Sequence, residues 1–291
     1  MRVLVTGAGG MLGREVTLAC HRRGNEVIAL ARAALDVTDA RAIDRTIARY
    51  RPDAVVNCAG FTDIDGAEDD EVAAMRVNDE GAAMLSAAAA RIGAKIVYPS
   101  SDLVFDGAAR KAYVESDLPA PLSAQGRSKQ AGETSVAVAN PRHFVIRSAW
   151  LYGLGGENFV ETMLRLGREQ PEVLVASDRV GSPTYARHLA AALSMLVEGE
   201  EYGIHHIAGS GRCSWYEFAQ EIFDQAGIEC RVMGAPADML AHRAARPTYS
   251  PLRSERPDPI RLPDWREGLA AYLRARAGAP AEDGSRIGGA A

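Results

Sequence analysis

Three glycines near the start of the chain have the spacing of a phosphate-binding turn. Gly7, Gly10 and Gly13 follow the pattern G-x-x-G-x-x-G. They come directly after the short apolar run from Arg2 to Thr6, and an amphipathic helical pattern follows from Glu15 onward. Where Cβ atoms are missing, a phosphate can approach the backbone, and the N–H groups at the start of the next helix can hold its charge. The pattern therefore predicts a dinucleotide-binding turn.

The segment after the second apolar run bears on which dinucleotide this turn would take. Glu26 to Leu30 is expected to be a strand, and it ends without the acidic residue that would bind a ribose 2′-hydroxyl. Arg32 could instead meet a 2′-phosphate, or it could be an ordinary solvated arginine. Asp36 and Val37 would lie beside the adenine, although an acid in this stretch could cap a helix instead. We therefore expect NADPH as the cofactor, with NADH as the alternative.

Apolar runs and helical patterns alternate through the first half of the chain. Strands are expected at 2–6, 26–30, 54–58, 95–99 and 143–147, and helices at 39–49, at 67–92 and around residue 129. Strands separated by helices imply right-handed crossovers and a parallel sheet covered on both faces. The expected fold class is therefore α/β, a doubly wound parallel sheet of the Rossmann kind, with its ligand beyond the carboxyl ends of the strands.

The pattern loosens in the second half, which predicts a smaller lobe for the substrate. Helices are expected at 158–167, 185–197, 214–226 and 263–277, and a strand at 205–208. Ser214 and Glu217 have the spacing of a capping box at the start of one of these helices. The expected divisions are a nucleotide-binding domain at 1–152, to which later segments could return, a substrate-binding lobe at 153–278 and a disordered tail at 279–291.

Composition is that of an ordinary globular protein. The chain has 291 residues, of which 47% are hydrophobic and 24% charged, and its net charge of −5 argues against nucleic acid or a membrane as the main partner. The four cysteines lack metal-ligand spacing, so we expect free thiols in a reducing cytoplasm and no metal site. Met1 leads directly into the first strand, which leaves no room for a signal peptide. A cytoplasmic monomer or homodimer is expected.

Segments along most of the chain resemble the extended short-chain dehydrogenase/reductase superfamily, and within it the dTDP-4-dehydrorhamnose reductases. The segments are TGAGGMLG from residue 6, VVNCAGFTDIDGAE from 55, RVNDEGA from 76, PSSDLVFDG from 99, GRSKQAGE from 126 and IRSAWLYG from 146. ENFVETML, GSPTYARHLA and SWYEFA continue the match in the family's order. The resemblance implies hydride transfer from NADPH to the C4 carbonyl of a dTDP-sugar.

The resemblance also implies roles for individual residues. The pyrophosphate would lie against Gly7, Gly10, Met11 and Leu12, and the ribose and nicotinamide along Cys58, Ala59 and Gly60. Lys129 would hold the nicotinamide ribose and lower the pKa of a neighbouring tyrosine, and Ser101 would hydrogen-bond the substrate carbonyl. The residues expected near the sugar nucleotide are Ser101, Asp102, Leu103, Trp150, Asn158 and Arg246.

Two positions depart from the family's pattern. The family motif is Y-x-x-x-K, but Gln125 stands four residues before Lys129, and Leu103 stands where a second tyrosine is usual. Neither of the other two lysines has a tyrosine four residues before it. A glutamine amide can donate a hydrogen bond, but it cannot supply a proton near neutral pH. Because general acid catalysis is typically worth about 10²–10⁴-fold, ordinary ketone reduction should slow by about that factor.

Three functions are compatible with this altered site. The first is a sugar reductase whose Gln125 and Leu103, natural or introduced, weaken the reaction. The second is a reductase remodelled for apolar ketones or for cyclic imines, because an iminium ion needs no proton from the protein. The third is a catalytically silent NADP-binding regulatory subunit. Ser101 and Lys129 both persist, which a pure binding protein would not need, so we expect an oxidoreductase acting on C=O or C=N.

Overall fold

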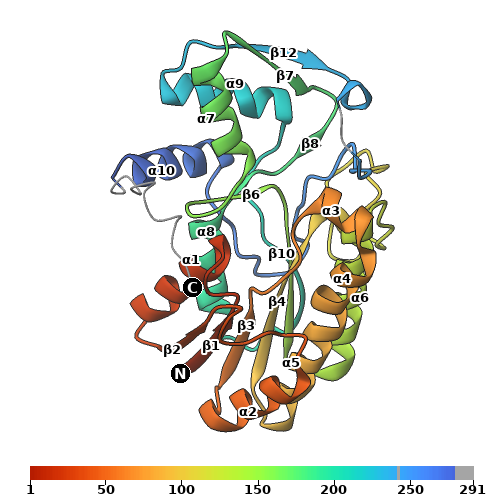
Figure 1. The fold of residues 1–291 in the computed structure, drawn as a ribbon, viewed down its shortest axis with the longest axis vertical. Coiled ribbons are helices and arrows are strands. Elements are labelled where there is room, and N and C mark those ends of the chain that lie inside the picture. Colours follow the sequence, from red (N-terminus) through yellow and green to blue (C-terminus); the bar gives the residue numbers. More distant parts are fainter. Residues whose placement is uncertain (241–242, 279–291) are drawn as a thin grey trace, which may run out of the picture.

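A six-stranded parallel sheet forms the larger part of the molecule in the computed structural model, which describes residues 1–240 and 243–278 (Figure 1). The predicted disordered tail lies outside the described residues. The strands are β1 (Arg2–Thr6), β2 (Glu26–Leu30), β3 (Ala54–Asn57), β4 (Lys95–Ser101), β5 (His143–Ser148) and β10 (Gly203–His206). Their order is β10-β5-β4-β3-β1-β2. The order reverses between β1 and β3, so the predicted doubly wound sheet is confirmed, and a crevice is expected where its direction changes.

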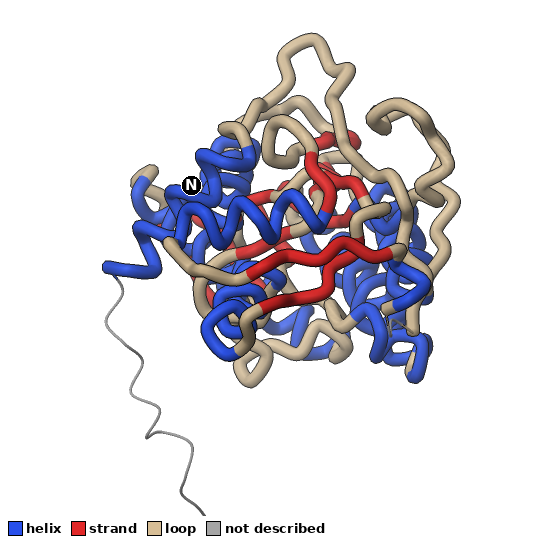
Figure 2. Tube along the Cα trace, turned by 90° about the horizontal axis from the view of Figure 1, so that it is seen from above, coloured by secondary structure: helices blue, strands red, loops and turns tan. Residues whose placement is uncertain are grey.

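Helices cover both faces of this sheet (Figure 1), and the view from above looks down on the smaller lobe that stands over the sheet (Figure 2). One face packs against α1 (Met11–Arg22) and α8 (Ala186–Leu196), and the other against α2 (Ala40–Tyr50), α5 (Ala82–Arg91) and α6 (Ala124–Ala139). Neighbouring strand residues alternate between the two cores: Val3 and Val5 face the first, and Leu4 faces the second. Near-continuous apolar strands therefore bury both of their sides, as a parallel sheet requires.

The helix predicted over 67–92 is interrupted, and this is a correction to the sequence interpretation. The segment forms α3 (Ile64–Asp69), α4 (Glu71–Met75), a π-helical stretch (Arg76–Gly81) and α5. The side chain of Asp70 accepts a hydrogen bond from the N–H of Ala73, and its φ of −142° ends one helix while it caps the next. An aspartate competes in this way for nearby backbone N–H groups, and the apolar periodicity does not reveal it.

A smaller lobe follows β5, and aromatic side chains fill its core. It contains α7 (Phe159–Glu169), the parallel pair β7 (Glu172–Ala176) and β12 (Arg231–Ala235), α9 (Trp215–Ala226) and α10 (Trp265–Gly278). Short strands β6 (Leu151–Tyr152), β8 (Val180–Gly181), β9 (Thr184–Tyr185) and β11 (Cys213–Ser214) complete it. The predicted capping box of Ser214 and Glu217 is present at the start of α9. Between these elements, α8 and β10 return to the large sheet.

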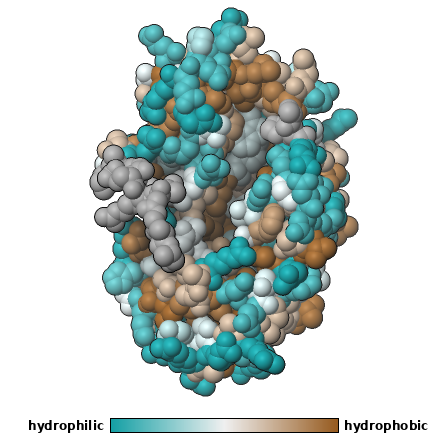
Figure 3. All heavy atoms as spheres, in the orientation of Figure 1, coloured by the Kyte–Doolittle hydropathy of each residue, from teal (hydrophilic) through white to brown (hydrophobic). Residues whose placement is uncertain are grey.

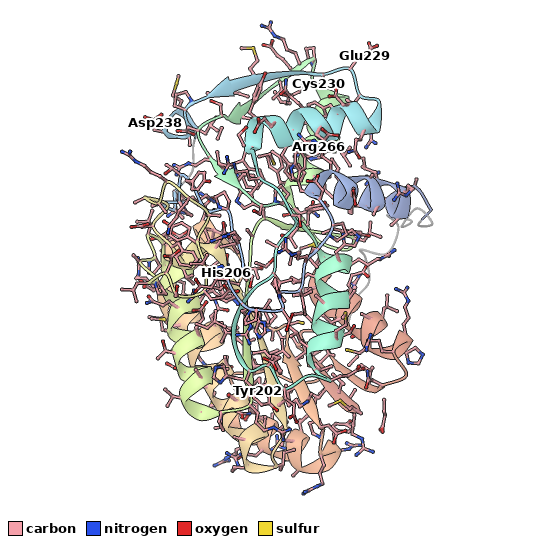
Figure 4. The ribbon with its side chains drawn as sticks, turned by 180° about the vertical axis from the view of Figure 1, so that it is seen from behind. Tyr202, His206, Glu229, Cys230, Asp238 and Arg266 are labelled. Carbon is pink, nitrogen blue, oxygen red and sulfur yellow. The ribbon has the colours of Figure 1, made fainter. Side chains whose placement is uncertain are left out.

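The view from behind shows how far the two parts extend (Figure 4). Glu229 and Cys230 lie at the far end of the smaller lobe, and His206 lies on the sheet strand β10. From the front, the surface is hollowed between the two parts (Figure 3). Among the described residues, no helix is long and apolar enough to cross a membrane.

Candidate active site

The glycine turn between β1 and α1 presents bare backbone. Gly7 has a φ of +59°, and a Cβ built there would lie 2.5 Å from the backbone N of Ala59. A Cβ on Gly13 would overlap the carbonyl oxygen of Gly7. Gly10 is the N-cap of α1, and no side chain caps this helix. The first N–H groups of α1 thus lack a side-chain acceptor and are suited to an anion, which fits a pyrophosphate.

Replacing Gly7 with alanine is expected to disrupt this turn. The new Cβ would press on the backbone after β3, and the left-handed φ would strain the residue. We expect a loss of about 1–3 kcal/mol in the free energy of unfolding and at least about tenfold weaker NADPH binding. Urea unfolding and a fluorescence titration with NADPH measure the two effects. Gly9→Ala is the matched control, because its Cβ would only touch Ala31 at 3.5 Å, and equal behaviour of the two variants would contradict the assignment.

The predicted adenosine end lies after β2. Arg32 is exposed in the turn that follows this strand. One carboxylate oxygen of Asp36 accepts hydrogen bonds from the backbone N and the hydroxyl of Thr38, at 2.9 and 2.8 Å, which lowers the pKa of Asp36. Asp39 is the N-cap of α2, so an acid in this stretch does cap a helix, which was the alternative that the sequence left open. Contact of Arg32, Asp36 and the buried Val37 with a cofactor stays a prediction.

The predicted nicotinamide end lies between β3 and α6. Cys58, Ala59 and Gly60 directly follow β3, and a Cβ built on Gly60 would lie 3.3 Å from Nζ of Lys129. That ammonium donates a hydrogen bond to the carbonyl oxygen of Pro99 at 3.1 Å and lies 4.9 Å from the ring centroid of Tyr98. Burial lowers the pKa of Lys129 to about 8. Lys129 therefore remains mostly charged at neutral pH, within reach of a ligand that lies along Gly60.

Gln125 lies one helical turn before Lys129 on α6. Its side chain is 5% exposed, and its amide nitrogen donates to the carbonyl oxygen of Phe61 at 3.3 Å. Its side-chain oxygen is buried and has no hydrogen-bond partner among the described residues. A Cβ on the next residue, Gly126, would overlap the carbonyl oxygen of Leu103. The structure thus packs the start of α6, which carries Gln125, against the backbone of Leu103, although 22 positions separate the two residues in the sequence.

Ser101 ends β4 and leads into a short 3₁₀ turn, Asp102–Val104. Its hydroxyl donates to one carboxylate oxygen of Asp102 at 3.0 Å and accepts from the N–H of Leu103 at 3.2 Å. The other oxygen of Asp102 accepts from the hydroxyl of Ser250 at 2.5 Å. Asp102 is 3% exposed, and this burial raises its pKa to about 6. A buried carboxyl therefore lies directly behind the hydroxyl that the sequence assigns to the substrate.

The other three residues predicted near the sugar nucleotide, Trp150, Asn158 and Arg246, occupy different settings. The ring of Trp150 stacks on that of Trp215, with centroids 3.6 Å apart. Asn158 is the N-cap of α7, and its amide nitrogen donates to the carbonyls of Gly153 and Gly156. Arg246 pairs with Asp65 at 3.1 Å. Asn158 therefore has a capping role in this structure, and contact of these residues with a substrate stays a prediction.

Comparison with known proteins identifies the family. The model of the RmlD substrate binding domain matches residues 1–277. The chain belongs to this family. Spore coat polysaccharide biosynthesis protein SpsK of Bacillus subtilis is 40% identical over 280 residues, which cover 96% of this chain and 99% of that protein. The dTDP-4-dehydrorhamnose reductase of Streptomyces griseus is also 40% identical, covering 96% of each chain. The Bacillus anthracis dTDP-4-dehydrorhamnose reductase, crystallised with NADP, is 35% identical with a TM-score of 0.92, covering 94% of this chain and 99% of that one.

Membership of the dTDP-4-dehydrorhamnose reductase family makes this chain an oxidoreductase that acts on C=O. The resemblance stated from the sequence is thereby confirmed, and so is the fold. No group of three or more histidine, cysteine, aspartate or glutamate side chains that could hold a metal occurs among residues 1–240 and 243–278. All four cysteines are free thiols.

The sequence interpretation missed Asn78, whose side chain connects two segments of the candidate site. Its amide nitrogen donates to the carbonyl of Phe61 and to the hydroxyl of Ser128, and its oxygen accepts from the N–H of Phe61 at 2.9 Å. Asn78 lies in the π-helical stretch, a distortion that often marks functional sites. It therefore joins the residues after β3 to α6. An asparagine inside a long apolar helix pattern was the available signal, because asparagine disfavours helix interiors.

Proposed function

We propose that this chain reduces the C4 carbonyl of a dTDP-linked 4-keto sugar with NADPH, at a site whose proton supply is altered. One observation carries the proposal. Lys129 of α6 lies beside Gly60, which follows β3, Ser101 ends β4, and the residues after β3 adjoin the bare glycine turn at Gly7, in a chain that matches named dTDP-4-dehydrorhamnose reductases over almost its full length. The relative crystallised with NADP supports the choice of cofactor.

The residues present fit this cofactor. The uncapped start of α1 suits its pyrophosphate, and the Lys129 ammonium beside Gly60 suits the hydroxyls of its nicotinamide ribose. When bound, the reduced nicotinamide supplies a hydride. Ser101 then has the task of holding the carbonyl oxygen of the substrate, because its hydroxyl lies at the end of β4 and is half-buried. Gln125 lies where the family pattern leads us to expect a tyrosine, and it has no acidic proton to give.

The direct test follows the near-ultraviolet absorbance of NADPH. The chain is mixed with dTDP-4-dehydro-6-deoxy-L-mannose, and the Gln125→Tyr variant is measured beside it. We expect sugar-dependent oxidation of NADPH that is slow in the unmodified chain and faster in the variant. If neither protein oxidises NADPH with the sugar, the proposed function is wrong. Tight NADPH binding without turnover of any acceptor would favour the regulatory subunit instead.

The side-chain oxygen of Gln125 favours a second candidate, the reduction of C=N bonds. This oxygen is a buried acceptor without a partner among the described residues, and such an atom is costly unless a ligand satisfies it. An iminium ion carries an N–H that could donate to it, and it needs no further proton. Leu103 leaves the neighbouring wall apolar. Faster NADPH oxidation with cyclic imines than with the sugar would decide for this candidate.

A further inference from the structure

Ketone reduction by this chain needs a proton donor, and its tyrosines do not provide one. All nine tyrosines lie in the described part of the chain, where the side chains of Ser101, Gln125 and Lys129 have no hydrogen bond to a tyrosine hydroxyl, and the ring of Tyr98 lies beside the Lys129 ammonium. The hydroxyl of Tyr98 is fully buried and donates to the carbonyl oxygen of Asn78 at 2.7 Å, so it is turned toward the protein interior. Another group must therefore protonate the alkoxide that forms when a ketone accepts a hydride.

Asp102 has the geometry of such a proton source. One of its oxygens lies 3.0 Å from the hydroxyl oxygen of Ser101, and Ser101 is the residue assigned to the substrate carbonyl. Its other oxygen accepts a hydrogen bond at 2.5 Å from the hydroxyl of Ser250, which lies between β12 and α10 in the sequence. Asp102 forms no ion pair among the described residues. The carboxyl is thus buried, uncompensated by any cation and connected to the site through one hydroxyl.

We propose that Asp102 supplies the proton for carbonyl reduction through the hydroxyl of Ser101, which rests on the proposed function. As the carbonyl carbon gains the hydride, the π electron pair of C=O moves onto the oxygen. In the protonated state the Asp102 carboxyl donates to the Ser101 oxygen, which reverses the Ser101–Asp102 hydrogen bond described above and turns the Ser101 hydroxyl toward the substrate. The substrate oxygen takes the proton of the Ser101 hydroxyl, and Ser101 takes the proton of the Asp102 carboxyl. One C–H and one O–H bond form in the product, and Asp102 is left as a carboxylate. Water regains access to Ser101 after product release and returns the proton by the same route.

The surroundings of Asp102 keep its carboxyl protonated up to a higher pH than that of an ordinary aspartate. Burial is the largest influence and raises its pKa to about 6, while hydrogen bonds from Ser250 and Ser101 lower it to a smaller extent. The cations on the neighbouring helix α6 are engaged elsewhere: Lys129 with the carbonyl of Pro99, and Arg127 with Glu71. Arg179, which precedes the strand beside Ser250, bonds to a backbone carbonyl. The relay is therefore complete below the pKa of Asp102 and fails progressively above it.

The test compares Asp102→Asn with the unmodified chain across pH 5 to 9, using NADPH and the dTDP-linked ketone. We expect kcat of the unmodified chain to fall as the pH rises past about 6, since the carboxyl must be protonated. At low pH the kcat of Asp102→Asn should be about 10²-fold lower than that of the unmodified chain. The kcat of this variant should also no longer fall as the pH rises past about 6. Ser250→Ala removes a hydrogen bond that lowers the pKa of Asp102, so the fall in kcat should move to higher pH.

A rescue experiment separates proton supply from a merely structural role. In Asp102→Asn/Gln125→Tyr the tyrosine provides its own proton, so kcat should return to that of Gln125→Tyr alone. Infrared titration of the NADPH-bound protein gives a reading without turnover, because Asp102→Asn removes the band of the buried protonated carboxyl. A carboxyl that titrates at the ordinary aspartate pKa would overturn the relay, and so would a double variant as slow as Asp102→Asn.

Two further outcomes keep the relay distinct from the proposed function. If the unmodified chain reduces the sugar and Asp102→Asn does so equally fast, the relay alone is wrong. If the unmodified chain leaves the sugar untouched, the relay is also wrong, because Asp102 and Ser101 were in place and delivered no proton. Only if Gln125→Tyr leaves the sugar untouched as well does the proposed function fall with it.

Discussion

Replacing Gln125 with tyrosine is expected to raise kcat for sugar-ketone reduction by about 10²-fold at pH 8, with little change in KM. The tyrosine hydroxyl would stand one helical turn from the Lys129 ammonium, which favours its ionised form and so makes it a better acid. The gain should be greatest above pH 6, where Asp102 has lost its proton, and smaller at pH 5. Steady-state NADPH oxidation over this pH range measures it.

Gln125→Phe is the matched control for this variant. A phenylalanine brings the same ring but no hydroxyl, so its kcat should stay at or below that of the unmodified chain. If phenylalanine raised the rate as much as tyrosine, the gain would come from packing against Leu103 and not from a proton. A Gln125→Tyr variant no faster than the unmodified chain would contradict the role assigned to position 125.

Removing Arg147 is expected to destabilise the protein by about 3–5 kcal/mol, because it would leave a buried carboxylate without its cation. Three N–O contacts of 2.7–3.2 Å join the guanidinium of Arg147 on β5 to the carboxylate of Glu133 on α6. The two side chains are 2% and 6% exposed. Ser100, at 2.5 Å, would be the only remaining hydrogen-bond partner of the Glu133 carboxylate among the described residues. Urea unfolding of Arg147→Met at neutral pH measures the loss.

The double variant Arg147→Met/Glu133→Leu is the control. Replacing both charges with apolar side chains removes the unpaired carboxylate, so most of the lost stability should return. If Arg147→Met alone lowered the free energy of unfolding by less than about 1 kcal/mol, the Arg147–Glu133 pair would behave like an exposed ion pair, and Glu133 would have to be solvated. NADPH binding by both variants is a second reading, because Lys129 lies one turn before Glu133 on the same helix.

The sheet was predictable from the sequence because buried parallel strands are short apolar runs that alternate with helical patterns. The glycine turn was also predictable, because its function depends on exposed backbone and the spacing of three nearby glycines indicates where that backbone lies. Asn78 was not, because its role depends on a π-helical distortion inside a segment whose apolar pattern suits one continuous helix. The contact of Asp102 with Ser250 joins residues 148 positions apart, and no local pattern encodes such a pairing.

The return of β10 to the large sheet has a consequence for the order in which this chain can fold. The edge strand β10 and the covering helix α8 are synthesised only after α7 and β7 of the smaller lobe. Until then β5 has an open edge, and the apolar side chains of β1 and β5 lack the cover of α8. A nascent chain of about 150 residues is thus an incomplete unit that is prone to aggregation. Cutting the gene near residue 152 should yield an insoluble fragment and no free-standing nucleotide-binding domain.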